Sequence, residues 1–241
     1  MGLEAIILAG GLGTRLRKVV PNLPKPLAKV QDQPFLDLLL HQLATSKQIQ
    51  KLILAVSYKA ETIIDYYTTR GKKYSFPISF SVEGQPLGTG GAIKKALAQT
   101  KGSFILVMNG DSYVEFDIAQ LVTHHLRKKQ PITLVLTHQD DLQRYGNVLV
   151  DPLSCQVRAF REKSNATKSG LISTGVYLID RNAFEGWPEK KSFSLEKDFF
   201  PARIQNGMSA FITHGKFIDI GLPESYKRAH NYLQNELKEL Q

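Results

Sequence analysis

A glycine-rich turn near the start of the chain has the composition of an anion-binding loop. Gly10, Gly11 and Gly13 follow a short apolar segment. Glycines let the backbone approach a ligand closely and point successive N–H groups at it. Arg15, two residues further on, adds a planar fork of donors suited to phosphate oxygens. The turn lacks the Gly-Lys-Ser/Thr ending of a P-loop, and Leu16 stands where the dinucleotide fingerprint needs Gly or Ala.

A lysine follows this turn between two prolines. Pro24 and Pro26 stiffen the backbone on either side of Lys25, so its ammonium is presented from a restrained segment. Together with Arg15, it would neutralise a phosphorylated ligand. Short glycine motifs are weak signals on their own, and an ordinary turn with exposed cations fits them equally well.

Two aspartates could supply oxygen ligands to a metal ion. Asp111 follows an apolar segment, at the kind of strand end where open α/β sheets place their ligands. Asp219 stands between Ile218 and Ile220, so in an extended segment its carboxylate points away from both apolar neighbours. Two carboxylates that converge on a triphosphate form a hard-oxygen Mg²⁺ site. The alternative is a capping Asp111 and a solvated Asp219.

The first half of the chain alternates between strand-like and helix-like segments. Apolar runs bounded by turn residues predict buried parallel strands, and helical spacing of apolar residues predicts the helices between them. This alternation is typical of a doubly wound α/β sheet. The strands are expected at 4–9, 51–57, 78–82, 103–108 and 132–137, and the helices at 35–43, 60–69, 88–98 and 117–129.

The second half is richer in strands. Segments 145–150, 157–162 and 175–179 lie too close together for crossover helices, so we expect antiparallel additions to the sheet. A helix at 195–205, strands at 209–213 and 216–220, and a helix from Pro223 complete the chain. The prediction is one Rossmann-like mixed α/β domain over 1–241, with a first half at about 1–137, a small β-rich lobe at about 138–221 and a terminal helix at 223–240.

Composition excludes several classes of protein. The 241 residues are 42% hydrophobic and 22% charged, as in an ordinary soluble globule. No run is long enough to span a membrane, no signal peptide is evident, and the single cysteine, Cys155, fits a reducing cytoplasm. The net charge of +9 favours an anionic ligand, but the basic runs are scattered and carry no nucleic-acid-binding motif. The His124–His125 pair is expected at the surface.

Taken together, the motifs resemble the sugar-1-phosphate nucleotidylyltransferases, also called NDP-sugar pyrophosphorylases. The similarity follows the family's order along residues 4 to 230. It is carried by LAGGLGTRL from Leu8 and LPKP from Leu23, by QPLGTGGA from Gln85, NGD from Asn109, FREK from Phe160, STGVY from Ser173 and FIDIG from Phe217.

Membership of this family implies a reaction. A sugar 1-phosphate oxygen attacks the α-phosphorus of a nucleoside triphosphate, and pyrophosphate leaves with the help of Mg²⁺. Such a transfer needs the protein to position the two substrates and to neutralise the phosphate charge, and it needs no covalent nucleophile from the protein. The resemblance implies catalytic roles for Arg15, Lys25 and Asp111, and Mg²⁺ ligation by Asp111 and Asp219. It places the nucleotide on Leu8, Gly10, Gly11, Gly13, Thr14, Glu83 and Gly88, and the sugar phosphate on Gly146, Glu162, Lys163 and Thr174.

The resemblance also suggests which substrates are used. SLEKDFFP from Ser194 and IDIGLPE from Ile218 are most similar to the branch that activates D-glycero-α-D-manno-heptose 1-phosphate with GTP. Glu83 stands where the family contacts the nucleobase, and a carboxylate can accept from both adjacent donors of guanine. Ser173 replaces the asparagine that many relatives carry, which leaves sugar identity less determined.

Other functions stay open at this point. They are a UTP- or dTTP-using hexose-1-phosphate enzyme, a catalytically silent NDP-sugar-binding homologue and a basic nucleic-acid-binding domain. The apolar face of the helix from Pro223 suits either docking onto the domain or contact with a second copy, so homo-oligomerisation is also open.

Overall fold

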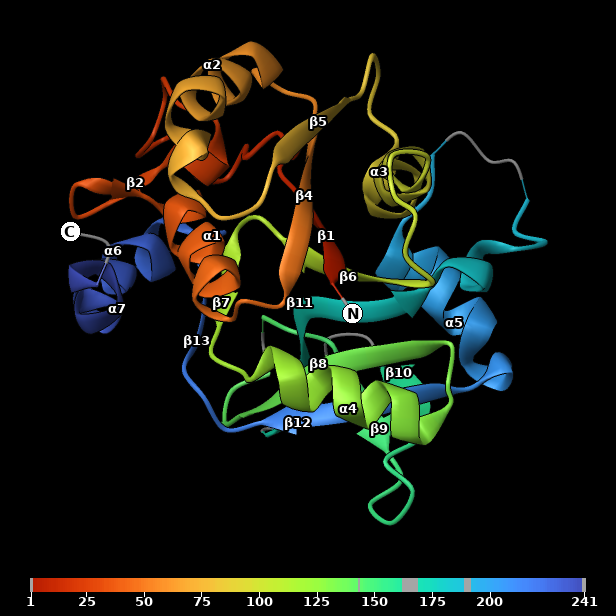
Figure 1. Ribbon diagram of the computed structural model, residues 1–241. Helices are drawn as coiled ribbons and strands as arrows, with labels where there is room; N and C mark the ends of the chain where they lie inside the picture. Colours follow the sequence, from red (N-terminus) through yellow and green to blue (C-terminus); the bar gives the residue numbers. More distant parts are fainter. Residues whose placement is uncertain (1, 143, 162–168, 189–191, 240–241) are drawn as a thin grey trace.

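A mixed β-sheet forms the centre of the molecule (Figure 1). The structure is a computed structural model that describes residues 2–142, 144–161, 169–188 and 192–239. In this part of the chain the sheet has seven strands in the order β12-β8-β11-β6-β1-β4-β5, and only β11 runs antiparallel to its neighbours. The strands are β1 (Leu3–Leu8), β4 (Ile49–Val56), β5 (Ile78–Val82), β6 (Phe104–Asn109), β8 (Ile132–Gln139), β11 (Gly170–Asp180) and β12 (Met208–Thr213).

Apolar residues cover both faces of the sheet. Along β1, Ala5 and Ile7 belong to one buried cluster while Ile6 belongs to a second cluster on the opposite face. β-Strands alternate their side chains in this way, so the continuous apolar run of the sequence requires a covering layer on each side.

Helices supply both covering layers. One cluster contains apolar residues of α1 (Phe35–Thr45), α2 (Ala60–Arg70), α4 (Ile118–Lys128) and α6 (Pro223–Tyr232). The other contains residues of α3 (Gly88–Leu97) and α5 (Phe200–Arg203). This arrangement confirms the predicted doubly wound mixed α/β sheet.

The strand order reverses at β1, which lies between β4 and β6. Loops that leave the carboxyl ends of these strands diverge toward opposite sides of the sheet, and open α/β sheets bind their ligands in the resulting crevice. The glycine turn follows β1 and the Asn109-Gly110-Asp111 segment follows β6, so both predicted motifs lie at this reversal.

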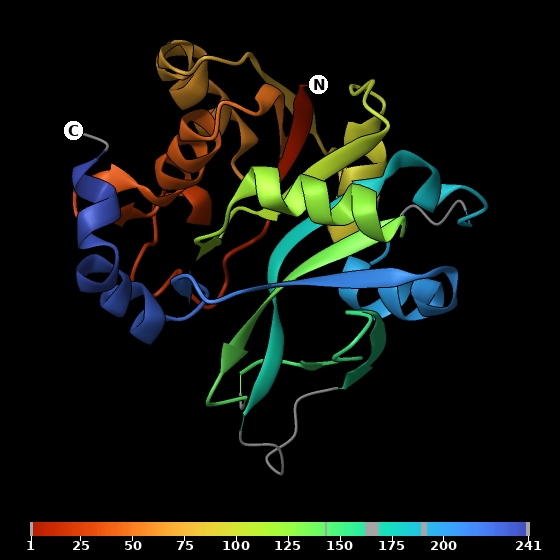
Figure 2. The same cartoon turned by 60° about the horizontal axis from the view of Figure 1, so that its bottom comes forward.

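Smaller pairs of strands surround the sheet. β9 (Asn147–Val150) and β10 (Val157–Arg161) form an antiparallel pair beside β11, visible at the lower side of Figure 2. β7 (Ser112–Val114) pairs with β13 (Phe217–Asp219), and β2 (Lys29–Val30) pairs with β3 (Gln33–Pro34). The pairing of β7 with β13 brings Asp219 opposite Ser112, next to Asp111.

Two predicted helices are interrupted. The segment expected at 195–205 begins with a π-helical turn at Leu195–Phe199 and ends with a 3-10 turn at Ile204–Asn206, leaving α5 only one turn long. The helix from Pro223 stops at Tyr232 and resumes as α7 (Gln234–Lys238), because Leu233 leaves helical geometry at φ −104° and ψ 19°. None of the helices in the described ranges is long and apolar enough to cross a bilayer.

The prediction that His124 and His125 lie at the surface is wrong. Their side chains are 9% and 3% exposed. His125 contacts Thr133 and Asp180, at 2.8 and 3.0 Å. His124 lies edge-on to Phe211, and burial, assisted by the nearby Lys128, lowers its pKa to about 4. Adjacent helix positions point in different directions, but α4 lies close enough to the sheet to bury both.

Candidate active site

Two adjoining cavities lie beyond the carboxyl ends of β1 and β6. One has a volume of about 190 Å³ and the other about 160 Å³, and Leu8, Gly11 and Thr89 line both. The larger also contacts Gly10, Glu83 and Gly88, whereas the smaller contacts Lys25, Asn109 and Asp111. Of the predicted nucleotide and catalytic residues, Leu8, Gly10, Gly11, Glu83, Gly88, Lys25 and Asp111 therefore border these adjoining cavities.

The glycine turn is fixed by its contact with the lysine segment. Gly13 adopts the left-handed φ of +59°, and a β-carbon there would approach Cβ of Lys25 to 3.2 Å. After Gly13 the backbone winds into successive turns, with the N–H groups of Leu16 and Arg17 both donating to the Gly13 carbonyl. Arg15 and Thr14 remain exposed on this turn, and neither lines the two cavities.

Lys25 and Asp111 form an ion pair. The ammonium of Lys25 lies 2.5 Å from Oδ2 of Asp111, and its side chain is only 10% exposed. Ser112 donates a hydrogen bond to Oδ1 of the same carboxylate at 3.2 Å. Pro24 and Pro26 flank the lysine, and the backbone N–H of Leu27 donates to the Pro24 carbonyl, so a short 3-10 turn at Lys25–Leu27 aims the ammonium at the site.

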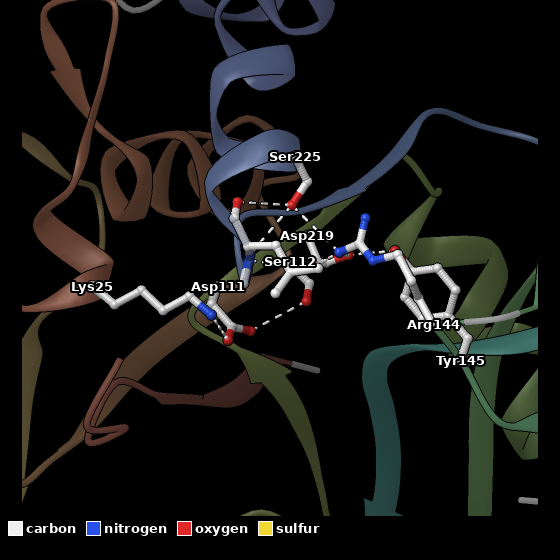
Figure 3. Close-up of polar contacts among 9 residues, drawn as sticks. Lys25, Asp111, Ser112, Arg144, Tyr145, Asp219 and Ser225 are labelled. Carbon is white, nitrogen blue, oxygen red and sulfur yellow. Dashed lines mark hydrogen bonds and ion pairs between the residues drawn. The ribbon is translucent and has the colours of Figure 1, made fainter. Parts of the chain in front are cut away.

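Asp219 is held by side chains that the sequence analysis did not identify. Arg144 donates to both carboxylate oxygens at 2.9 Å, and the Tyr145 hydroxyl donates to Oδ2 (Figure 3). Burial and the Asp219 carboxylate raise the pKa of Tyr145. These partners lie more than seventy positions away in the sequence, and no local pattern marks them.

Gly221 shows how closely the charged groups converge. A β-carbon on Gly221 would stand 2.8 Å from Oδ1 of Asp219, 3.4 Å from Nζ of Lys25 and 3.8 Å from a terminal nitrogen of Arg15. The backbone N–H of Ile220 also donates to the Asp111 carbonyl at 2.9 Å. The fold thus brings together Arg15, Lys25, Asp111 and Asp219, four of the charged residues that the motifs singled out.

The donor set fits a hard divalent cation. Asp111 and Asp219 come from neighbouring segments, and Mg²⁺ binds through one or two carboxylates together with substrate phosphates and water. Within the described residues, no group of three or more His, Cys, Asp or Glu side chains could hold a metal without such help. Asp111 pairs with Lys25 and Asp219 pairs with Arg144, so each carboxylate lies beside a positive charge.

Glu83 lies at the other end of the region. One carboxylate oxygen accepts a hydrogen bond from the Leu87 N–H at 2.9 Å, and the other is 3.1 Å from the position of a β-carbon on Gly10. Burial raises the pKa of this carboxyl group, while the Leu87 N–H and Lys95 oppose the shift. Glu83 is therefore a partly desolvated acceptor facing the 190 Å³ cavity.

A third cavity, of about 290 Å³, lies beside β9 and β11. Tyr145, Gly146, Ser173 and Glu196 are among its lining residues. Thr174, which we expected in the sugar pocket, is instead 1% exposed and donates its hydroxyl hydrogen to the Val135 carbonyl at 2.8 Å. Strand alternation turns its side chain into the sheet and leaves Ser173 on the cavity side. Glu162 and Lys163 lie outside the described residues.

Glu196 connects this third cavity with the other two. It accepts hydrogen bonds from the Tyr177 hydroxyl at 2.8 Å and from Thr89 at 3.3 Å. Thr89 lines both smaller cavities, and its hydroxyl also accepts from the Leu195 N–H at 2.8 Å. The sequence analysis used Glu196 only as part of a motif, and its position between the cavities becomes visible in the fold.

Comparison with known proteins identifies the class. A family model described as nucleotidyl transferase matches residues 4–236. The chain belongs to this nucleotidyl transferase family, which confirms the family and the enzyme class predicted from the motifs.

The more similar relatives are guanylyltransferases. The chain is 38% identical over 234 residues to a D-glycero-alpha-D-manno-heptose 1-phosphate guanylyltransferase of Aneurinibacillus thermoaerophilus, covering 97% of this chain and 99% of that protein. The enzyme of the same description from Campylobacter jejuni is also 38% identical, with 93% and 97% covered.

Solved structures agree with these relatives. The crystal structure of HddC from Yersinia pseudotuberculosis complexed with GMP-PN superimposes with a TM-score of 0.84 at 36% identity, covering 95% of this chain and 98% of that one. A UDP-glucose pyrophosphorylase at 18% identity and a TM-score of 0.79 shares the fold, with 98% of this chain and 100% of that one covered.

Proposed function

We propose that the protein transfers GMP from GTP to D-glycero-α-D-manno-heptose 1-phosphate, forming GDP-heptose and releasing pyrophosphate. The observation that carries the choice of nucleotide is Glu83, a desolvated carboxylate at the 190 Å³ cavity. The heptose is proposed from the two relatives at 38% identity, whose described substrate is this sugar phosphate.

In this proposal the nucleotide occupies the half at about 1–137. Guanine lies in the 190 Å³ cavity, where its ring N–H and exocyclic amine donate to Glu83. Leu8, Gly10, Gly11 and Gly88 surround it. The triphosphate extends along the turn that contains Gly13 and Thr14, toward the cations near Gly221.

Arg15 and Lys25 stabilise the charge of the transfer. A sugar phosphate oxygen bonds to the α-phosphorus as the bond to the β-phosphate oxygen breaks, and the electron pair leaves with pyrophosphate. Charge accumulates on the oxygens around phosphorus during this exchange, and preoriented cations offset it without reorganising. The exposed Arg15 is suited to the leaving pyrophosphate, and the largely buried Lys25 to the transferred phosphate.

We assign Mg²⁺ to Asp111 and Asp219. When bound, the ion would polarise phosphate oxygens and hold the triphosphate in an attack-ready geometry. Arg144 and Tyr145 keep the Asp219 carboxylate in place. Lys25, which pairs with Asp111 here, is then free to turn toward phosphate.

The sugar phosphate is assigned to the half at about 138–221. The 290 Å³ cavity has Gly146 and Ser173 at its wall, and Glu162 and Lys163 keep their proposed contacts with the sugar hydroxyls and the phosphate. We place the reaction in the cytoplasm, in keeping with the free Cys155.

A pyrophosphate-release screen tests the proposal. Four nucleoside triphosphates are crossed with a panel of sugar 1-phosphates that includes the heptose, mannose, glucose and N-acetylglucosamine compounds, with and without Mg²⁺. The proposal predicts the highest kcat/KM for GTP with the heptose 1-phosphate. A preference for UTP or dTTP would support the hexose-1-phosphate alternative, and tight NDP-sugar binding without turnover would indicate a silent homologue.

A further inference from the structure

We infer that Asn109 recognises a hydroxyl group of the substrate and so determines specificity at the junction between nucleotide and sugar. This inference rests on the proposed function and adds to it a residue to which no role has been given above. It starts from an unsatisfied amide at the end of β6.

The Asn109 side chain has no polar partner within the described residues. Its Oδ1 is buried and accepts no hydrogen bond there. The side chain nevertheless lines the 160 Å³ cavity together with Lys25 and Asp111. Burying an amide oxygen without a donor is costly, so sites of this kind usually receive their partner from a ligand or from water.

The backbone opposite Asn109 is shaped to admit this amide. Gly175 on β11 adopts φ +79°, and a β-carbon there would stand 2.5 Å from Nδ2 of Asn109. The register of β11 against β8 jumps between Ser173 and Val176, so Thr174 and Gly175 form a bulge. The hydroxyl of Thr174 fastens this bulge to the Val135 carbonyl at 2.8 Å. A glycine, a bulge and a buried threonine together make room for one asparagine side chain.

The chemistry of the amide selects the kind of group it would bind. An amide offers a donor and an acceptor side by side, and a hydroxyl likewise both donates and accepts. This match holds whichever way the amide is turned. A phosphate oxygen only accepts, so it would leave Oδ1 unpaired, and phosphate already has the cations Lys25 and Arg15 nearby. The ligand group is therefore a hydroxyl, either of the sugar ring or of the ribose.

Replacing Asn109 by leucine tests the inference. Asn109→Leu keeps the branched shape of the side chain and removes both polar atoms. Because the buried unpaired oxygen disappears, the unliganded variant should melt at the same temperature as the wild type or higher. We expect kcat/KM with the natural substrates to fall by about tenfold, the usual effect of losing one neutral hydrogen bond. Asn182→Leu, at an exposed asparagine remote from the cavities, is the control.

Deoxy substrates distinguish the two sources of the hydroxyl. Wild type and Asn109→Leu are compared with monodeoxy analogues of the sugar 1-phosphate, and with 2′-deoxy- and 3′-deoxy-GTP. For wild type, kcat/KM should be about tenfold lower with the analogue that lacks the recognised hydroxyl than with the complete substrate. With that analogue, wild type and Asn109→Leu should have equal kcat/KM. If Asn109→Leu no longer discriminates against a deoxy sugar phosphate, Asn109 contacts the sugar. If it no longer discriminates against a deoxy nucleotide, Asn109 contacts the ribose.

Several outcomes would overturn the inference. Unchanged kcat/KM in Asn109→Leu would do so, as would an equal loss with every substrate and analogue, or a lower melting temperature accompanied by a proportional loss of activity. If wild type transfers nucleotide to no sugar 1-phosphate, the proposed function is wrong. The role of Asn109 is then tested by ligand-induced rises in melting temperature, measured for both proteins with the same hydroxylated and deoxy compounds. If each compound raises the melting temperature of wild type and of Asn109→Leu equally, the inference is wrong.

Discussion

The proposed nucleotide end and the proposed sugar end of the site are constructed differently. At the nucleotide end, short stretches of consecutive residues after β1 and β5 present backbone and a single carboxylate to the cavity. At the sugar end, side chains far apart in the sequence hold one another, as Arg144 holds Asp219 and Tyr177 and Thr89 hold Glu196. A backbone cradle suits phosphates common to all triphosphates, whereas a side-chain network can be altered one residue at a time to accept another sugar.

The largest expected effect concerns the boundary between the two ends, where the carboxylates meet. Asp111→Asn and Asp219→Asn should each lower kcat by about 10³-fold or more, because the metal contributes several kcal/mol to transition-state stabilisation. Initial rates over a range of Mg²⁺ concentrations check this, with unfolding curves to show that each variant folds. Asp151→Asn, at a surface turn, is the control, and full wild-type activity in EDTA would contradict the two-carboxylate site.

Next in size is the removal of a cation from the nucleotide end. Arg15→Ala should lower kcat by about 10²–10³-fold, the usual effect of deleting one preoriented donor from developing charge. Arg17 offers a matched control two positions away, since its guanidinium lies over the Tyr58 ring at 4.5 Å. Arg17→Ala should retain most of the activity. If Arg15→Ala turned over as fast as Arg17→Ala, the glycine turn would not be the triphosphate site.

Base recognition provides a third test of the nucleotide end. Glu83→Gln should reduce the preference for GTP over UTP by roughly 1–3 kcal/mol, because an amide cannot accept from both guanine donors. The measurement is the ratio of kcat/KM values for the two nucleotides in each protein. An unchanged ratio would show that Glu83 does not contact the base.

A smaller effect is expected at the sugar end. Glu196→Gln keeps the shape of the side chain but weakens its hydrogen bonds to Tyr177 and Thr89. We expect KM for the sugar 1-phosphate to rise by about three- to tenfold while KM for GTP stays within about twofold. Tyr177→Phe should reproduce part of the change. Equal increases in both KM values would contradict the assignment of Glu196 to the sugar end alone.

The smallest expected effect is a dependence on pH that belongs to the nucleotide end alone. Burial raises the pKa of Glu83 above the ordinary 4.5, so on acidification it takes up a proton earlier than a solvated glutamate. A protonated carboxyl group cannot accept two hydrogen bonds from guanine. The ratio of kcat/KM for GTP to kcat/KM for UTP should therefore decline as the pH falls toward the raised pKa of Glu83, and Glu83→Gln should show no such decline. A ratio independent of pH in wild type would contradict this.

The same contrast explains what the sequence could predict. The doubly wound sheet was predictable because buried parallel strands are continuous apolar runs, such as 51–57 and 103–108. The positions of Gly10, Asp111 and Asp219 followed from motifs at strand ends, and that of Lys25 from the prolines on either side of it. Arg144 and Tyr145 escaped detection because only the fold brings them to Asp219. Thr174 was misjudged because neighbouring side chains of a strand face opposite sides: Ser173 faces the cavity, and the Thr174 hydroxyl donates to the Val135 carbonyl instead.

The contacts of helix α6 have a consequence for how the enzyme folds during its synthesis. It is fastened to the segment that follows Lys25, since the Tyr226 hydroxyl donates to the Lys29 carbonyl and the Gln31 N–H donates to His230 at 2.9 Å. A ribosome makes Lys25 early and residues 219–230 almost two hundred positions later. A nascent chain can therefore form β1, β4 and the glycine turn while Lys25, the proposed catalytic lysine, is still unanchored and Asp219 is not yet made. The nascent chain should not become an active enzyme until α6 has emerged and docked.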